Sequence, residues 1–292
     1  MNEVLIAGCG DVGIRLGQKL AARGCEVWGL RRRAEALPAP LRAIAADLRE
    51  PESLRSLPCK PEWLVYAASA DSAAEADYRA AYVDGPLHLL QALEAQHAWP
   101  RRLVFVSSTS VYAQSGGAWV DEESPAEAQS LSGRCLREAE VRLAERHPGL
   151  IVFRAAGIYG PGRTRLLRSV AEGSLALPPS PHYTNRIHRE DCAAAIEHLL
   201  HLDDAHSLYL GADDEPTDLH EVVRWLCASL GVSSLPQAKG ENWRRQGTSK
   251  RISNARLKAT GFRFSYPTFR EGYAEMIPDF LAAGGVLAPG RP

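Results

Sequence analysis

Three glycines near the start of the chain have the spacing of a phosphate-binding turn. The run Gly8–Gly13 reads G-C-G-D-V-G, follows a short apolar run and precedes residues at helical spacing. In a strand–turn–helix unit, Gly8 permits the tight turn, Gly10 lets a pyrophosphate approach the backbone, and Gly13 lets the helix pack on the strand. The N–H groups of the first helical turn, around Asp11 and Val12, then bind phosphate together with the helix dipole. Because the required context is present, the motif predicts dinucleotide binding.

The end of the second apolar run, Cys25–Leu30, carries the position that selects between dinucleotides. Many NAD sites have Asp or Glu about 20 residues past the glycines, where it binds the ribose hydroxyls. Here Arg31 and Arg32 occupy that place, and no acid appears before Glu35. A guanidinium holds a 2′-phosphate by paired hydrogen bonds, whereas a carboxylate repels it. Arg31 and Arg32 therefore favour NADP(H) over NAD(H). An NAD site with a solvated basic loop remains the alternative.

Small and polar residues follow two further apolar runs. Ala67 and Ala68 end the run that begins at Trp63, and their small size leaves room for a cofactor to pass over the strand end. The run Leu103–Val106 continues into a polar cluster, Ser107–Tyr112. Open α/β sheets bind ligands at the carboxyl ends of their strands. We therefore assign Ala67, Ala68 and Ser107 to the predicted cofactor site.

Apolar runs alternate with helical patterns through the first half of the chain, which predicts an α/β fold with a doubly wound parallel sheet of the Rossmann type. The strands expected are 3–7, 25–30, 42–46, 63–68, 103–106 and 150–154, and the clearest helices are 72–96 and 131–146. Asp84-Gly85-Pro86 should perturb the first of these helices. From Gly160 onward Pro and Gly are frequent. We expect an NAD(P)-binding domain over 1–160 and a smaller, interleaved substrate lobe over 161–292, with a strand near 208–210 rejoining the main sheet.

Composition narrows the class of protein. The 292 residues include 34 Lys and Arg against 35 Asp and Glu, which argues against a dedicated nucleic-acid binder or a polybasic membrane protein. No apolar run approaches the ~20 residues that span a bilayer, and no signal peptide is recognised. The six cysteines have no metal-ligand spacing. They are expected to be small buried residues in a reducing cytoplasm. A monomer and a homodimer are both compatible with the sequence, and no metal is expected.

Taken together, the motifs resemble the extended and atypical short-chain dehydrogenases/reductases, known as NAD-dependent epimerase/dehydratases or nucleoside-diphosphate-sugar epimerases. The resemblance covers nearly the whole chain and includes Arg154–Gly162 (R-A-A-G-I-Y-G-P-G), Arg186–Asp191 (R-I-H-R-E-D) and Gly261-Phe262. Extended members usually have G-x-x-G-x-x-G, so the G-x-G-x-x-G found here points to an atypical subgroup. The resemblance implies an NAD(P)-dependent oxidoreductase or epimerase acting on a carbonyl or sugar nucleotide. It also places Asp47 and Leu48 beside the adenine.

The catalytic pattern of that family is incomplete in this chain. The family uses a Tyr as acid/base, a Lys four residues later that lowers the pKa of the Tyr, and a Ser or Thr that polarises the substrate oxygen. Matching the helix 131–146 puts Ser132 at the Tyr position and Leu136 at the Lys position. A serine hydroxyl is a much weaker acid than a phenol, and Leu136 carries no charge. The Asp-Glu pair of the family's dehydratases is replaced by Thr109 and Ser110, so sugar dehydration by that route is not expected.

Three residues are candidates for the remaining chemistry. Ser108 matches the family's Ser or Thr, although a capping hydroxyl at a strand end is an equal alternative. Tyr159 lies in a segment that is close to the nicotinamide in the family, and it is the best replacement acid. Tyr112 is a further candidate, more consistent with packing.

Other residues of the second half have weaker assignments. His188 and Asp191 match a family element that orders the lobe junction, so a structural role is expected. His182 and Tyr183 could line the substrate cleft. Basic residues that could hold a substrate phosphate, or more simply form a solvated face, are Arg163, Arg165, Arg168, Arg244, Arg245, Lys250 and Arg251.

Two functions follow from the sequence. The first is an NADP(H)-dependent oxidoreductase or epimerase on a carbonyl or sugar-nucleotide substrate, with Ser108 and Tyr159 as catalytic candidates. The second is a non-catalytic NADP(H)-binding sensor, which the missing Tyr and Lys favour. Because many chemistries use this fold, the fold alone does not decide between them.

Overall fold

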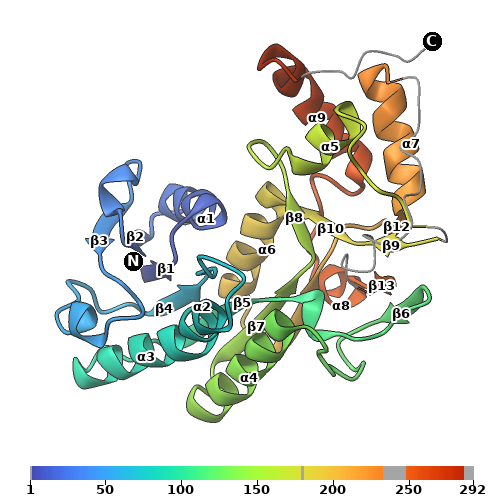
Figure 1. Ribbon diagram of the computed structural model, residues 1–292. Helices are drawn as coiled ribbons and strands as arrows, with labels where there is room; N and C mark the ends of the chain where they lie inside the picture. Colours follow the sequence, from blue (N-terminus) through green and yellow to red (C-terminus); the bar gives the residue numbers. More distant parts are fainter. Residues whose placement is uncertain (1, 179–180, 233–247, 286–292) are drawn as a thin grey trace. The chain divides into compact units, whose positions relative to one another are not determined.

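The computed structural model describes residues 2–178, 181–232 and 248–285 (Figure 1). The chain divides into two compact units. Unit 1 consists of Met1–Ala113, Ser124–Ala155 and Cys192–Gly211, and unit 2 of Gln114–Glu123, Ala156–Asp191 and Ala212–Pro292. The units interleave: the main boundary follows Ala155 rather than residue 160, and unit 1 also includes Cys192–Gly211, which contains the strand expected near 208–210.

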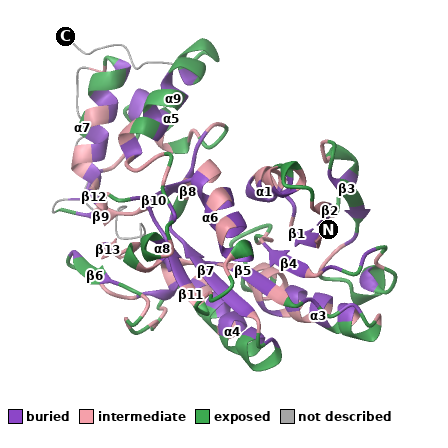
Figure 2. Ribbon diagram, turned by 180° about the vertical axis from the view of Figure 1, so that it is seen from behind, coloured by how far each residue is buried: buried purple, intermediate pink, exposed green. Residues whose placement is uncertain are grey.

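Unit 1 is built on a seven-stranded sheet of order β11-β7-β5-β4-β1-β2-β3. Every neighbouring pair in this sheet is parallel, as the Rossmann prediction required. The strands are β1 (Glu3–Ala7), β2 (Glu26–Arg31), β3 (Arg42–Ala45), β4 (Trp63–Tyr66), β5 (Arg102–Ser108), β7 (Leu150–Ala155) and β11 (Leu208–Gly211). The strand expected near 208–210 is β11, which pairs with β7. Strands β4 and β7 are buried along their whole length (Figure 2), as parallel strands covered on both faces must be.

Helices cover both faces of this sheet (Figure 1). Helix α1 and the Cys192–His201 part of α6 lie on one face, and α2, α3 and α4 on the other. Their bounds are α1 (Asp11–Ala22), α2 (Glu75–Arg79), α3 (Gly85–Ala95), α4 (Leu131–Arg146) and α6 (Arg189–His201), with short 3₁₀ turns η1 (Ala34–Ala36), η2 (Pro51–Leu54) and η4 (Thr109–Val111). The long helix expected over 72–96 is interrupted, because a π-helical turn, η3 (Ala80–Asp84), separates α2 from α3.

The π-turn has a local cause. Pro86 has no N–H, so the carbonyls of Tyr82 and Ala81, four and five residues earlier, lose a helical donor. The buried hydroxyl of Tyr66 on β4 donates to the Ala81 carbonyl at 2.6 Å. Gly85 makes room for that hydroxyl, since a Cβ there would lie 2.4 Å from it. The predicted perturbation by Gly85-Pro86 is thus confirmed.

Unit 2 contains short strands in pairs and a helical core. Strands pair as β8 with β10, β9 with β12, and β6 with β13. Their bounds are β6 (Ala118–Val120), β8 (Gly157–Tyr159), β9 (Tyr183–Thr184), β10 (Arg186–His188), β12 (Thr217–Asp218) and β13 (Lys250–Ile252). The helices are α5 (Arg165–Ala171), α7 (Leu219–Leu230), α8 (Ala255–Ala259) and α9 (Phe269–Ala282). Helices α5, α7 and α9 contribute to one apolar cluster, which also contains Tyr159.

Candidate functional site

The glycine turn after β1 has the geometry that the sequence predicts. Gly8 has a φ of 76°, and its N–H donates to the Leu30 carbonyl at 3.0 Å. A Cβ at this position would lie 2.3 Å from the Cα of Ala68 and 2.8 Å from the carbonyl carbon of Ala67. Gly8 is therefore required both by its backbone conformation and by the close approach of the chain after β4. Ala67 and Ala68 lie directly against the turn.

The next two glycines differ in what surrounds them. A Cβ on Gly10, which precedes α1, would meet only the Gly8 carbonyl oxygen at 3.8 Å. Gly10 is the N-cap residue of α1 and has no side chain that could cap it, and the first N–H groups of an α-helix have no intrahelical partner. A Cβ on Gly13 would lie 3.1 Å from Ile6 Cγ2, so this glycine permits close helix–strand packing. An open backbone surface at Gly10 beside a helix N-terminus fits a pyrophosphate.

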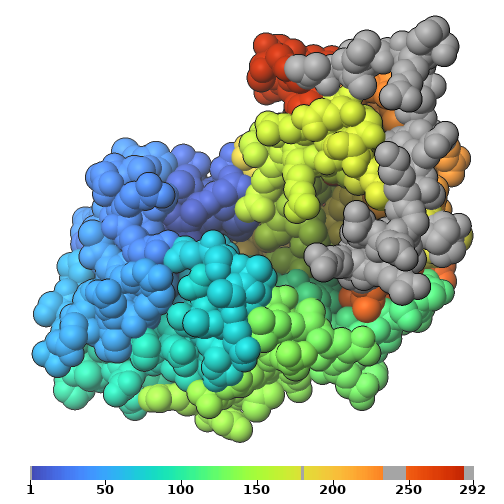
Figure 3. Space-filling view, in the orientation of Figure 1, coloured from blue at the N-terminus to red at the C-terminus, as the bar shows by residue number. Residues whose placement is uncertain are grey.

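A network of charged side chains lies at the ends of β2, β3 and β4. Arg32, directly after β2, donates two hydrogen bonds to the Asp71 carboxylate, at 2.8 and 2.5 Å. Arg49 bonds both to Asp47, with 2.6 Å for the shortest contact, and to Asp71 at 3.3 Å. Arg31 instead donates to the Cys9 carbonyl at 3.4 Å, beside the glycine turn. The N-terminal third of the chain, blue to cyan in Figure 3, forms a continuous surface on the face in view.

These contacts set the electrostatics of that edge. Hydrogen bonds from Arg49 lower the pKa of Asp47, and hydrogen bonds from Arg32 lower the pKa of Asp71. The reciprocal contact with Asp71 raises the pKa of Arg32. Both acids are therefore ionised at neutral pH. Arg31 thus lies beside a carbonyl oxygen, and Arg32 beside a carboxylate.

A buried polar network lies at the carboxyl ends of the neighbouring strands β5 and β7. Ser107 donates to Glu140 of α4 at 2.7 Å. Arg154 of β7 donates to both carboxylate oxygens of Glu140, at 2.9 and 2.6 Å, and to the Tyr112 hydroxyl at 2.7 Å. All four residues are buried, with at most 4% of their surface exposed. Burial disfavours the charged guanidinium, but its bonds to Glu140 and Tyr112 outweigh this and raise the pKa of Arg154.

Serine hydroxyls occupy the region where the family has its acid/base. Ser108 accepts a hydrogen bond from the Ser110 N–H at 3.1 Å and caps η4, which is the alternative role that the sequence allowed. Ser130 caps α4 by accepting from the Gly133 N–H at 3.1 Å, and its hydroxyl lies 3.5 Å from that of Ser132. Leu136, at the Lys position, is a buried core residue. Neither Ser132 nor Leu136, the residues that the sequence matches to the family's Tyr and Lys, has an ionisable side chain.

Comparison with known proteins identifies the family. Residues 4–203 match the model of the NAD dependent epimerase/dehydratase family. The chain belongs to this family. Protein YeeZ from Escherichia coli (strain K12) is 30% identical over 279 residues, which are 91% of this chain and 97% of YeeZ. A Methylobacillus flagellatus structure, named for the NAD-dependent epimerase/dehydratases, is 37% identical with a TM-score of 0.81 and covers 96% of this chain and 99% of its own.

Two more distant structures share the fold. The human epimerase family protein SDR39U1, solved with NADPH, is 22% identical with a TM-score of 0.76, covering 95% of this chain and 99% of its own. MoeE5, solved in complex with UDP-glucose and NAD, is 22% identical with a TM-score of 0.78, covering 96% and 99%. Within the described part of this epimerase/dehydratase, no helix is long and apolar enough to cross a bilayer. In that same part, no group of His, Cys, Asp and Glu side chains could hold a metal ion.

Tyr159 lies in a different setting from the one the sequence predicted. Its side chain is 4% exposed and belongs to the apolar cluster of unit 2, with ring contacts to His188 and Tyr273. The hydroxyl donates to the Thr268 carbonyl at 3.3 Å. Burial raises the pKa of Tyr159 far above its ordinary value. A phenol that is packed in a core and bonded to a backbone carbonyl is a poor proton donor, so we withdraw Tyr159 as the replacement acid.

Other candidates of the second half are structural. Asp191 accepts the N–H groups of Ser265 and Tyr266, each at 2.9 Å, and His188 stacks on Tyr266. His182 is buried, and its backbone N–H donates to Asp218 at 3.0 Å. The contacts of His188 and Asp191 are consistent with the structural role expected of them, and they are made with residues of unit 2.

The basic residues divide into different environments. Lys250 is 6% exposed rather than solvated, and burial lowers its pKa to about 8. Arg251 lies over the rings of Trp119 and Tyr183, at 5.0 and 4.9 Å, so it too is a packed cation. Arg163 and Arg165 are exposed. Arg244 and Arg245 lie outside the described residues.

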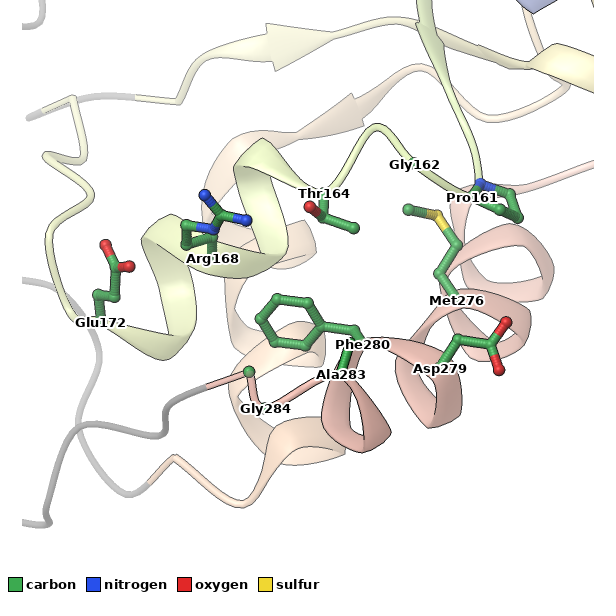
Figure 4. Close-up of a pocket in the computed structure, with 11 residues that line it drawn as sticks. Pro161, Gly162, Thr164, Arg168, Glu172, Met276, Asp279, Phe280, Ala283 and Gly284 are labelled. Carbon is green, nitrogen blue, oxygen red and sulfur yellow. The ribbon is translucent and has the colours of Figure 1, made fainter.

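A pocket of about 500 Å³ lies within unit 2, lined by residues of α5, α9 and the loop before α5 (Figure 4). Thr164 and Arg168 lie on the side of α5, and Met276 and Phe280 on α9, so polar and apolar side chains both line it. Glu172 and Asp279 also line the pocket. Two carboxylates against one guanidinium oppose the binding of a phosphate. The pocket therefore gives little support to Arg168 as a phosphate ligand.

Sequence reasoning missed the charged residues that organise both ends of the sheet edge. Glu140 repeats the spacing of the buried residues Leu136 and Leu143 on α4, and a carboxylate on an apolar helix face signals a buried partner. Arg154 ends an apolar strand and is the matching signal. Asp71 and Arg49 have no such signature, because exposed loop charges are common and only the fold brings them to Arg32.

Proposed function

We propose that this epimerase/dehydratase is an NADP(H)-dependent oxidoreductase or epimerase acting on a carbonyl or sugar-nucleotide substrate. The observation that carries the proposal is the open backbone surface at Gly10, beside the N-terminus of α1, with arginines at the end of β2. NADPH in SDR39U1, and NAD with UDP-glucose in MoeE5, support these cofactor and substrate classes.

Each part of the edge would have a defined task. The N–H groups that follow Gly10 would bind the pyrophosphate, and Arg31 and Arg32 the ribose 2′-phosphate. Asp47 and Leu48 would flank the adenine, while Ala67 and Ala68 would lie along the cofactor's path. Ser107 would contribute only its backbone, because its buried hydroxyl donates to Glu140. When bound, the cofactor supplies the hydride chemistry, and the chain orients it. Ser108 would polarise the substrate oxygen through the proton that its capping role leaves available.

Binding without turnover is the second candidate, and one observation favours it. The Tyr and Lys positions of α4 hold Ser132 and the buried Leu136, so the chain offers no phenol of lowered pKa there. General acid–base catalysis contributes roughly 10²–10⁴-fold to rates. Any turnover is therefore expected to be slow, and an NADP(H)-binding sensor would need none.

Calorimetric titration with NADP⁺ and NAD⁺ tests the proposal. NADP⁺ should bind roughly tenfold or more tightly, because the 2′-phosphate adds charge-assisted hydrogen bonds. Gly10→Val should abolish binding with little change in folding, since its side chain would occupy the ligand's space rather than the protein's. Replacing Arg31 and Arg32 together with Ala should level the two affinities. Equal affinities in the unaltered protein would overturn the NADP assignment, and unchanged binding by Gly10→Val would overturn the site.

Activity separates the two candidates. NADPH oxidation would be measured against a panel of carbonyls and sugar nucleotides. Turnover of a panel member supports the enzyme, whereas tight NADP⁺ binding with no turnover on any member favours the sensor.

A further inference from the structure

One ion pair crosses the end of the strand that carries the glycine turn. In the sheet, β1 lies between β2 and β4. Arg32 directly follows β2, and Asp71 lies in the loop after β4, so their two hydrogen bonds at 2.8 and 2.5 Å join the loops on either side of β1. Gly8 and Gly10 follow the strand between them. The Arg32–Asp71 pair thus spans the carboxyl end of β1.

The Asp71 carboxylate accepts two hydrogen bonds from the Arg32 guanidinium, the group that would bind the 2′-phosphate in the proposed function. A guanidinium binds a carboxylate or a phosphate with the same paired N–H groups, so both anions cannot hold that fork of Arg32 at once. The side chains of Arg32 and Asp71 are 51% and 41% exposed. Ion pairs at this exposure are weak and exchange readily with another anion.

Arg49 provides Asp71 with a second partner. Its guanidinium lies 3.3 Å from Asp71 and also binds Asp47, which comes from the end of β3. If Arg32 turns toward a phosphate, Asp71 therefore stays paired. Arg32 can therefore pair with Asp71 or with the phosphate, and in both arrangements each of these charged groups has a partner of opposite charge.

We propose that Asp71 is a specificity-determining residue of the cofactor site: it holds Arg32 while no 2′-phosphate is present and competes with that phosphate for the same guanidinium. This inference rests on the proposed function, because it needs a dinucleotide at the glycine turn. The competition weakens NADP(H) binding but not NAD(H) binding. Asp71 therefore reduces the preference for NADP(H) over NAD(H) that Arg31 and Arg32 provide. NAD⁺ leaves the Arg32–Asp71 pair intact.

The test compares Asp71→Asn with a charge-matched variant, Glu50→Gln, which removes one negative charge from the segment after β3. Glu50 is exposed and makes no ion pair with any residue in the described ranges. Affinities for NADP⁺ and NAD⁺ would be measured by calorimetry at low and high salt. Asp71→Asn should tighten NADP⁺ binding by about three- to tenfold at low salt and leave NAD⁺ within about twofold. Glu50→Gln should change neither by more than about twofold.

A double-mutant cycle identifies the route of the effect. In an Arg32→Ala background, Asp71→Asn should no longer tighten NADP⁺ binding, because the contested guanidinium is gone. Asp71→Ala, which introduces no amide, should tighten NADP⁺ binding in the same way, and thermal unfolding checks that the variant is folded. Unchanged or weaker NADP⁺ binding by Asp71→Asn overturns the inference while leaving the cofactor site standing. Failure of the unaltered protein to bind either dinucleotide overturns the proposed function itself.

Discussion

Along the carboxyl ends of the strands in unit 1, two groups of residues differ in burial and in composition: those after β1 to β4 and those after β5 and β7. At the carboxyl ends of β1 to β4, Gly10 leaves backbone surface open, and the ion-paired residues Arg32, Arg49 and Asp71 are exposed. At the carboxyl ends of β5 and β7, Ser107, Glu140, Arg154 and Tyr112 form a buried network. The first group has the features of a binding surface, and the second those of a structural core.

Under the proposed function, dinucleotide binding and proton transfer depend on separate residues. Phosphate binding needs bare backbone and a helix N-terminus, which α1 supplies locally. Proton transfer needs an acid of suitable pKa, which side chains of α4 would have to supply. A chain can lose the second without altering the first, and each group of residues can be tested separately.

Removal of the Glu140 carboxylate should have the largest effect. Glu140→Ala leaves the buried Arg154 guanidinium without its charge partner, which typically costs about 3–5 kcal/mol of unfolding free energy. Urea denaturation measures the loss. The control is Glu138→Ala, which breaks the partly exposed pair with Arg79 at 2.9 Å and should cost at most about 1 kcal/mol. Similar losses in both variants would mean that the network is not a structural core.

Gly8 and Gly24 provide the corresponding test of the first group. Both have positive φ, but a Cβ on Gly24 meets nothing within 4 Å, whereas one on Gly8 meets the backbone of Ala68. Gly24→Ala should cost about 1–2 kcal/mol from backbone conformation alone. Gly8→Ala should cost clearly more and also weaken NADP⁺ binding, because the turn must move. Equal costs in thermal unfolding would show that the close approach at Gly8 is unimportant.

Ser108 ends β5, the strand next to β4. Its role can be decided by measuring turnover and stability separately. If its hydroxyl polarises the substrate, Ser108→Ala should lower kcat about tenfold or more without changing cofactor affinity. If it only caps η4, the variant should lose about 1 kcal/mol of stability and no kcat. The proposed role predicts the first result in the NADPH oxidation assay. Ser110→Ala serves as the control, since Ser110 contributes its N–H rather than its hydroxyl to that bond.

The smallest effect is expected at Tyr159. Tyr159→Phe removes one hydrogen bond to the Thr268 carbonyl and should cost about 0.5–1.5 kcal/mol of stability. Turnover and cofactor affinity should stay unchanged, because the hydroxyl is enclosed in the core of unit 2. A large fall in kcat with normal folding would reinstate Tyr159 as the acid.

Elements with strong local signals were predictable from the sequence. The helix expected over 131–146 is observed with those bounds, because Ser130 caps it and His147-Pro148-Gly149 ends it. The parallel sheet followed from apolar runs of the right length. The strands of unit 2 were largely missed, since pairs such as β13 with β6 have three residues each and depend on partners distant in the sequence.

The part of the candidate site that consists of backbone groups could be predicted from the sequence. The part that depends on side-chain contacts was harder to predict. Gly8 and Gly13 carry their structural reason in their residue type. Tyr159 was misjudged because its position at a strand end gives no information on which side chains enclose it. Asp71 was missed because its partner, Arg32, is 39 residues away and only the order of β4, β1 and β2 brings them together.

The π-turn at Ala80–Asp84 has a consequence for comparing this chain with its relatives. A π-turn holds one residue more than an α-turn, and each residue rotates a helix by about 100°. A homologue one residue shorter here, with a donor in place of Pro86, could form an unbroken helix that presents the same faces before and after. When sequences are aligned, a single gap in this region therefore belongs inside the helix, at the π-turn, and not in the neighbouring loops.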